Sequence, residues 1–259
     1  MAAAFVSTAR ALFVPPWTLL VTSSAIALAK LTRDPVWLQR GQRFWARGFL
    51  RAWNVRVEIE WHNDVDRRGP YIVMANHASY IDVPLLFMGL PFIPGFVAKQ
   101  ELGRVPVLSM ALRAGGHVLL DRTDGKSTLR ALRAAASRIR QGQTVAIFPE
   151  GTRGDGQVLL PFKKGAFVLA KSAGVAILPV GIRGSHQVLA RGAFLPQAGV
   201  VRVTAGRPIA SEEIRSLSAD ALLARVRTEI AELSGLHSAC VSAPSPDNSA
   251  DPRSSKARC

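Results

Sequence analysis

A histidine and an aspartate stand five positions apart in the segment Asn-His-Ala-Ser-Tyr-Ile-Asp at residues 76–82. The segment directly follows residues 71–75, a run typical of a β-strand. A carboxylate beside an imidazole fixes the tautomer of the ring, and the ring can then take a proton from an attacking hydroxyl. The spacing therefore predicts that His77 is a general base held by Asp82. The alternative is a histidine in a turn, with Asp82 capping a helix.

A second group of polar side chains lies in Phe-Pro-Glu-Gly-Thr-Arg at residues 148–153, again after a strand-like run. The proline and the glycine predict a turn, and the ends of sheet strands are where α/β proteins bind ligands. Arg153 suits a phosphate because its planar guanidinium can bind two oxygens at once. A carboxylate repels a phosphate, so we expect Glu150 to orient Arg153 or to accept from a substrate hydroxyl. The alternative is a surface turn with an ion pair.

Two further cations complete the candidate substrate-binding group. Arg122 ends a strand as Arg153 does, so the two arginines are expected to converge on one phosphate. Lys99 follows the strand-like run 96–98, and the alternative for it is a solvated loop lysine. The predicted substrate-binding residues are Lys99, Arg122, Glu150, Gly151, Thr152 and Arg153.

These segments resemble motifs of the glycerolipid acyltransferase family, which includes the 1-acylglycerol-3-phosphate acyltransferases. The two blocks quoted above are similar to the family's NHxxxxD and FPEGTR motifs. Gly-His-Val-Leu-Leu-Asp-Arg at 116–122 and Ile-Leu-Pro-Val at 177–180 resemble its second and fourth motifs, in the same order. The resemblance covers roughly residues 56–207. Val118 and Leu119 stand where aromatic residues are frequent, which leaves the acyl chain and the acceptor open.

The resemblance implies that an acyl chain moves from acyl-CoA or acyl-carrier protein to the free hydroxyl of lysophosphatidate, giving phosphatidate. A thioester is already electrophilic, so a positioned base and good orientation suffice. We therefore expect no covalent acyl-enzyme, no metal and no resident cofactor. One alternative is the same reaction on another lysolipid, such as a lyso-ornithine lipid. The other is a non-enzymatic basic protein that binds membranes or nucleic acid.

Composition favours a membrane partner over nucleic acid. The 259 residues include 33 Lys and Arg against 18 Asp and Glu, for a net charge of +15, and 48% are hydrophobic. Such a charge suits polyanionic surroundings, and the hydrophobic content points to lipid. Both cysteines, Cys240 and Cys259, lie in the C-terminal tail, which excludes a thiol nucleophile in the candidate site.

Residues 1–54 are expected to form a membrane-associated helical segment. Residues 11–29 carry no charge, but Pro15 and Pro16 interrupt the run, and a spanning helix needs roughly 20 apolar residues. A re-entrant or shallow helix fits at least as well as a full span, and a signal peptide is a further alternative.

An amphipathic pattern follows in residues 36–53, which predicts a helix lying in the membrane interface. Its two opposed faces are Arg40, Arg43, Arg47 and Arg51 on one side and Leu38, Trp45, Phe49 and Trp53 on the other. The alternative is an amphipathic helix packed on its own domain. We expect the protein to be membrane-associated at the cytoplasmic face of a bacterial inner membrane.

Residues 55–236 alternate strand-like and helical patterns, which predicts an α/β acyltransferase domain. Its sheet is expected to be mostly parallel or mixed, with helices on both faces, as in the glycerol-3-phosphate acyltransferase-like fold. The expected strands are 55–61, 71–75, 95–98, 118–120, 144–148, 175–182 and 200–205. The expected helices are 83–88, 106–114, 127–140, 165–173 and 211–233. Residues 237–259 are rich in Ser, Pro and Asp, and are expected to be disordered.

Overall fold

The computed structural model describes residues 2–104, 109–110, 112–113, 115–120 and 125–238. Within these residues a seven-stranded sheet has the spatial order β1-β8-β7-β2-β5-β3-β4. All its neighbouring strands are parallel except β7 and β8, which are antiparallel, so the sheet is mixed. The strands are β1 Val55–Trp61, β2 Ile72–Ala75, β3 Gly95–Lys99, β4 Val118–Leu120, β5 Val145–Ile147, β7 Ile177–Arg183 and β8 Gly199–Ala205.

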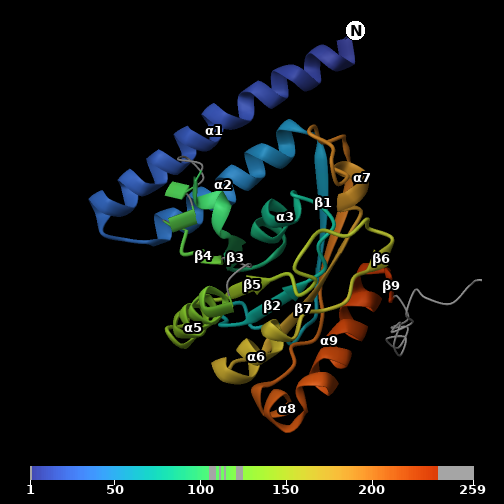
Figure 1. Ribbon diagram of the computed structural model, residues 1–259. Helices are drawn as coiled ribbons and strands as arrows, with labels where there is room; N and C mark the ends of the chain where they lie inside the picture. The colour runs from blue at the N-terminus through green and yellow to red at the C-terminus, as the bar shows by residue number, and fades with distance from the viewer. Residues whose placement is uncertain (1, 105–108, 111, 114, 121–124, 239–259) are drawn as a thin grey trace, which may run out of the picture.

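Helices cover both faces of this sheet, as expected for its largely parallel pairing (Figure 1). Successive residues of β2 point to opposite faces: Val73 packs in one buried cluster and Met74 in the other. The first cluster includes residues of α2 Val36–Ala52, α3 Asp82–Gly89 and α7 Ser185–Val188. The second includes residues of α5 Gly125–Arg140, α6 Lys164–Ala173, α8 Ser211–Ser216 and α9 Ala219–Ser234. The mixed α/β fold with helices on both faces is confirmed.

Two features of the C-terminal part differ from the sequence-based expectation. The expected helix 211–233 is broken, because the Ser218 hydroxyl accepts from Ala221 N–H at 3.1 Å and starts α9 as an N-cap. His237–Ser238, expected in the tail, form β9, which pairs with β6 Val158–Leu159. The remainder of that tail lies outside the described residues, as does most of the expected helix 106–114, which follows the 3-10 helix η1 Gln100–Arg104.

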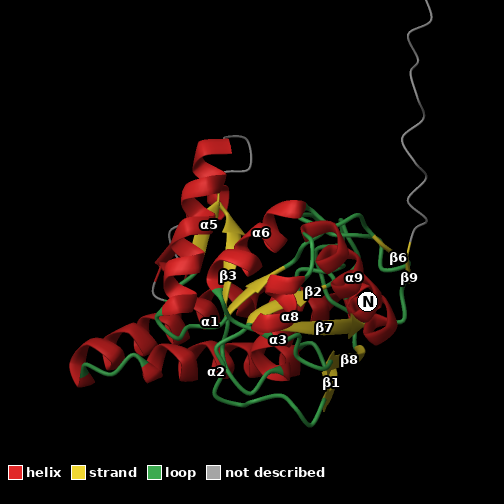
Figure 2. Cartoon of the chain, turned by 90° about the horizontal axis from the view of Figure 1, so that it is seen from below, coloured by secondary structure: helices red, strands yellow, loops and turns green. Residues whose placement is uncertain are grey.

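The N-terminal segment is one continuous helix, α1 Ala2–Thr32, which runs beside α2 (Figures 1 and 2). The interruption expected at Pro15 and Pro16 does not occur, although each proline removes one helical hydrogen bond. Two glycines of α2 let the helices approach closely. A Cβ at Gly41 would lie 2.5 Å from Ala25 Cβ, and one at Gly48 would lie 2.5 Å from the Trp17 ring.

The apolar side of α2 packs on the domain instead of facing open space. Ala46 and Leu50 are buried, and Trp53, just after the helix, is 2% exposed. Trp45 packs against the same cluster and donates from its indole to the Thr18 hydroxyl of α1 at 2.9 Å. The alternative of a helix packed on its own domain is therefore correct for this face.

Candidate active site

The sheet brings the two polar segments together. β2 and β5 are parallel neighbours with Met74 opposite Ile147, so the segments that follow them leave the same edge of the sheet. On the other side of β2, the Asn76 side chain donates to Ile182 O at 2.8 Å and accepts from Ile182 N at 2.7 Å. The Ser79 hydroxyl donates to Leu189 O at 2.7 Å. The loop that carries His77 is thus fixed to β7 and to the segment after it.

His77 and Asp82 form a hydrogen-bonded pair. The imidazole Nδ1 lies 2.7 Å from Asp82 Oδ2. A carboxylate can only accept, so Nδ1 carries the proton and a neutral ring has its lone pair on Nε2. The His77 side chain keeps 16% of its surface exposed, and its ring stacks on Phe148 with centroids 4.0 Å apart. This geometry suits a general base, whose reactive nitrogen would be Nε2.

The Asp82 carboxylate is fully buried, and its donors gather on Oδ2, while Oδ1 has no hydrogen-bond partner in the described part of the chain. Its Oδ2 also accepts from Ala78 N and Ser79 N, each at 2.8 Å. Asp82 is the first residue of α3, and a helix N-terminus favours a negative charge. Three donors on Oδ2 and the helix end therefore offset part of the desolvation of this carboxylate and hold its position against the imidazole.

Glu150 is a buried residue that hydrogen-bonds to the backbone of the site. Its Oε1 accepts from His77 N at 2.6 Å and its Oε2 accepts from Leu160 N at 2.9 Å, and the residue is 3% exposed. Both oxygens are occupied by backbone donors, so the expected role of orienting Arg153 or accepting from a substrate hydroxyl is wrong for this structure. Burial raises the pKa of Glu150 to about 7, although both backbone hydrogen bonds lower it. We regard Glu150 as a positioning residue for the His77 backbone.

Glu150→Gln should destabilise the protein in a pH-dependent way. The amide nitrogen of glutamine would face one of the two backbone N–H groups, at a cost of about 1–3 kcal/mol. The pKa of Glu150 is about 7 in the folded protein, against an ordinary value of 4.5. The bound proton therefore stabilises the folded wild type fully below about pH 4.5, and this stabilisation is lost as pH rises through 7. The melting temperatures of wild type and variant should therefore converge between about pH 5 and about pH 8. A gap that stays constant over that range would rule out the raised pKa.

Arg153 lies against the loop that carries the base. Its Cζ is 3.5 Å from the centroid of the Tyr80 ring, a cation–π contact between the two polar segments. Its Nη1 is buried and has no hydrogen-bond partner within the described part of the chain. A guanidinium with a buried, unused donor beside a candidate base is suited to an anionic group of a substrate.

The remaining predicted site residues have mixed outcomes. Gly151 has φ +71°, and a Cβ there would lie 2.8 Å from Lys163 Cε, so the turn requires glycine. Thr152 is exposed. Lys99 ends β3, which is separated from β2 by β5, and only its backbone position is described. Arg122 lies outside the described residues, so its convergence with Arg153 stays a prediction.

Sequence reasoning missed two aromatic contributors. Phe148 stacks on His77, and Tyr80 supports Arg153. Both lie inside the two polar segments, so their closeness to the chemistry was visible as sequence proximity. Their facing directions depend on how β2 and β5 pair, which neither segment encodes alone.

An apolar cavity of about 420 Å³ begins beside this loop. Its lining includes Tyr80 and residues of α1, α2 and α3. His117 lies on its wall, where the ring Nδ1 accepts from Phe96 N at 2.9 Å and Nε2 lies 3.1 Å from the Gln42 side-chain amide. Burial lowers the pKa of His117 to about 4, so this histidine is a neutral wall residue. Cavities of this size and character bind small apolar ligands.

Comparison with known proteins gives one family and several relatives. The sequence model described as Acyltransferase matches residues 56–183. The chain is 38% identical over 104 residues to the 1-acyl-sn-glycerol-3-phosphate acyltransferase of Helicobacter pylori, covering 40% of this chain and 44% of that protein. It is 32% identical over 131 residues to the lyso-ornithine lipid O-acyltransferase of Rhizobium meliloti, covering 51% and 44% respectively. These matches span less than half the length of either relative.

A solved structure shares this fold over most of the chain. The 1-acyl-sn-glycerophosphate acyltransferase PlsC from Thermotoga maritima superposes with a TM-score of 0.77 at 24% identity. The match covers 89% of this chain and 94% of that one, so it includes helices outside the segment that the family model matches.

Proposed function

We propose that the protein acylates lysophosphatidate to phosphatidate, because residues 56–183 match the sequence model described as Acyltransferase. The acyl donor is a thioester, either acyl-CoA or acyl-carrier protein. The observation that carries the proposal is the His77–Asp82 pair at 2.7 Å, next to Arg153 and to an apolar cavity. Relatives named for this reaction support the choice of acceptor.

The reaction follows from the protonation state of His77. Nε2 takes the proton of the acceptor hydroxyl as its oxygen attacks the thioester carbonyl carbon. Asp82 holds the imidazolium that forms, through the hydrogen bond to Nδ1. The carbon–sulfur bond then breaks, the thiolate leaves, and the imidazolium returns a proton to it. No metal and no resident cofactor enters this sequence.

The acyl chain and the phosphate of the substrates each have a matching site on the protein. The apolar cavity, whose lining includes Tyr80 and Val83, takes the acyl chain. The phosphate of lysophosphatidate binds Arg153, whose buried Nη1 it supplies with an acceptor. Lys99 and Arg122 remain proposed contributors to the same phosphate.

Arg153→Lys should raise the KM for lysophosphatidate about tenfold and leave that for acyl-CoA nearly unchanged. Lysine cannot reproduce a bidentate guanidinium, and a charge-assisted hydrogen bond of this kind contributes about 1.5–3 kcal/mol. Steady-state kinetics with each substrate varied in turn measures the split. Arg191→Lys is the matched control, because this exposed arginine hydrogen-bonds to the Arg153 carbonyl oxygen at 3.2 Å and not to the Arg153 side chain in the described structure. Equal increases for both substrates would assign Arg153 a structural role.

The membrane is the place of this reaction. Residues Arg10–Thr32 of α1 are long and apolar enough to cross a bilayer, by length and composition. A two-chain product stays in the bilayer, while acyl-CoA and acyl-carrier protein are soluble, so the site must work at a membrane surface. We place it at the cytoplasmic face of a bacterial inner membrane, in contact with membrane lipids and without a nucleic-acid partner.

An acceptor screen tests the function. Purified protein is given labelled acyl-CoA with lysophosphatidate, lysophosphatidylcholine or lyso-ornithine lipid, and products are read by mass spectrometry. Lysophosphatidate should be acylated at least about tenfold faster than either other acceptor, since only it presents a terminal phosphate to Arg153. Faster acylation of the lyso-ornithine lipid would transfer the assignment to the activity named for the Rhizobium meliloti relative.

A further inference from the structure

A second cavity, of about 610 Å³, lies between α1 and α2. Helical geometry separates it from the cavity beside the active site. On α1, Leu20 and Leu28 line the new cavity, whereas Thr18 and Thr22 line the cavity beside the active site. Val21 lies between these two sides of the helix and lines both cavities. The seam where the two helices touch therefore divides two apolar spaces, and the new one lies outside the proposed catalytic site.

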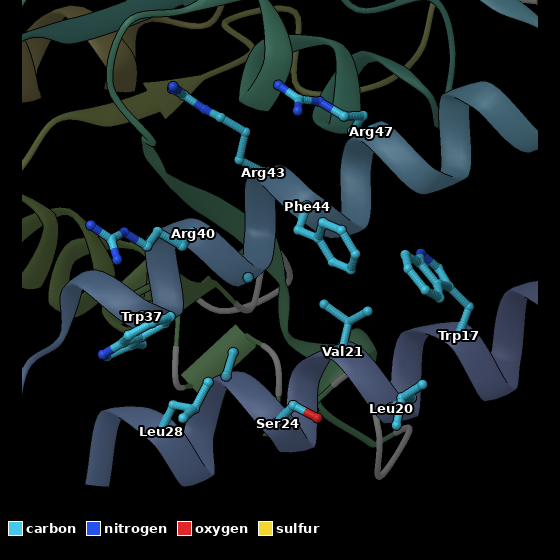
Figure 3. A pocket seen from close by; sticks show the side chains of 12 residues that line it. Trp17, Leu20, Val21, Ser24, Leu28, Trp37, Arg40, Arg43, Phe44 and Arg47 are labelled. Carbon is cyan, nitrogen blue, oxygen red and sulfur yellow. The ribbon is translucent and has the colours of Figure 1, made fainter. Parts of the chain in front are cut away.

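The walls of this cavity are largely apolar and partly open. Trp17 of α1 and Phe44 of α2 pack against each other in its wall, with ring centroids 5.1 Å apart (Figure 3). Leu20 is 62% exposed and Phe44 is 58% exposed, so neither side chain is covered by the rest of the protein. Uncovered apolar surface of this kind marks a binding site for an apolar group.

One edge of the cavity is cationic. Arg40, Arg43 and Arg47 line it with their stems, and Figure 3 shows them leaving α2 on the side away from α1. None of the lining residues is acidic. No carboxylate of the described residues lies within ion-pair distance of these arginines. Arg43 is partly committed, because its Nη2 donates to Leu90 O at 2.8 Å. Arg40 and Arg47 are exposed, and the Arg40 guanidinium lies over the Trp37 ring, 4.9 Å from its centroid.

The ligand must therefore combine an apolar chain with an anionic head. We propose that this cavity binds one anionic phospholipid of the bilayer, separately from the substrates. An acyl chain fills the space between the Trp17–Phe44 pair and Leu28, and the headgroup phosphate binds Arg40 and Arg47. Guanidinium groups pair well with phosphate oxygens, and they repel the ammonium of a zwitterionic headgroup. The site selects its lipid by the charge of the headgroup at the rim and by hydrophobic contact with the acyl chain inside the cavity.

Native mass spectrometry of the full chain in detergent micelles tests the site. The probe is phosphatidylglycerol, compared with phosphatidylcholine, lysophosphatidate and inorganic phosphate. One phosphatidylglycerol should bind about tenfold more tightly than phosphatidylcholine. Arg40→Gln with Arg47→Gln should weaken it about tenfold or more, and Ser24→Trp, which fills the cavity, should do the same. Melting temperatures show that each variant is folded.

A matched control separates a site from general attraction. Arg10→Gln with Arg51→Gln removes the same charge from the same two helices at positions that do not line the cavity. It should leave binding within about twofold, since surface charges act weakly at a distance. Equal losses in both double variants would overturn the proposal. Equal binding of phosphatidylcholine, displacement by inorganic phosphate, or binding of lysophosphatidate alone would overturn it as well.

Discussion

His77→Ala is expected to slow acyl transfer at least about a hundredfold, because a positioned general base contributes typically 10²–10⁴-fold. The structure gives the reason in one contact, since Asp82 fixes the Nδ1 proton at 2.7 Å and leaves Nε2 as the basic atom. Asp82→Asn should also lose most of the activity, because an amide can hold the wrong tautomer. Asp82 keeps two backbone donors in the alanine variant, so the loss of stability should stay near about 1–3 kcal/mol.

The chain provides its own control for this experiment. His62 and Asp64 form a second histidine–aspartate pair, with Nδ1 3.7 Å from Oδ2 and both side chains exposed. His62→Ala removes an imidazole beside a carboxylate without touching the site, and should leave the rate unchanged. Rates are measured with saturating acyl-CoA, well below the melting temperature of each variant. Retention of more than about a tenth of wild-type activity by His77→Ala would exclude it as the base.

The edge of the sheet shows best what the sequence could predict and what it could not. Strand-like runs before His77 and before Glu150 predicted two polar segments at strand ends, and β2 and β5 are indeed parallel neighbours. The sequence pattern did not show how deeply each polar side chain is buried. Glu150 is 3% exposed and holds two backbone donors, and no local signal distinguishes such a carboxylate from one that faces a substrate.

The N-terminal helices show a second limit of prediction from sequence. The opposed arginines and tryptophans of α2 were visible as a pattern, but a pattern does not name the partner of the apolar face. That face packs on the domain, with Trp53 2% exposed. Likewise Pro15 and Pro16 argue locally against a continuous helix, and close packing at Gly41 and Gly48 supports α1 along its length. Tertiary contacts decided both cases.

The packing of α2 changes how membrane attachment must be tested. Deleting residues 1–54 would remove Ala46, Leu50 and Trp53 from the core, so loss of binding would be confounded by unfolding. Exposed leucines of α1 that line neither cavity are a better target. Leu12, Leu19 and Leu31 are 71%, 47% and 82% exposed, and they do not line either cavity. Substitution there leaves the described contacts between α1 and α2 in place.

Changing Leu12, Leu19 and Leu31 together to Gln should reduce vesicle binding at least about a hundredfold without lowering the melting temperature. Burial of a leucine side chain contributes about 1.5–3 kcal/mol, and every 1.4 kcal/mol corresponds to tenfold in affinity. Changing the same three residues to Met is the control, because methionine keeps the apolar surface. Sedimentation with vesicles of phosphatidylcholine and phosphatidylglycerol measures both variants.

Salt separates the two forces that attach the protein. The apolar contribution of α1 should persist at high salt, whereas attraction between arginines and anionic lipid is screened. Wild type should therefore stay with the vesicles at high salt, and the remaining binding of the Gln variant should disappear there. If the folded Gln variant still sediments with vesicles at high salt, the apolar anchor lies elsewhere in the chain, and α1 is not what holds the protein on the membrane.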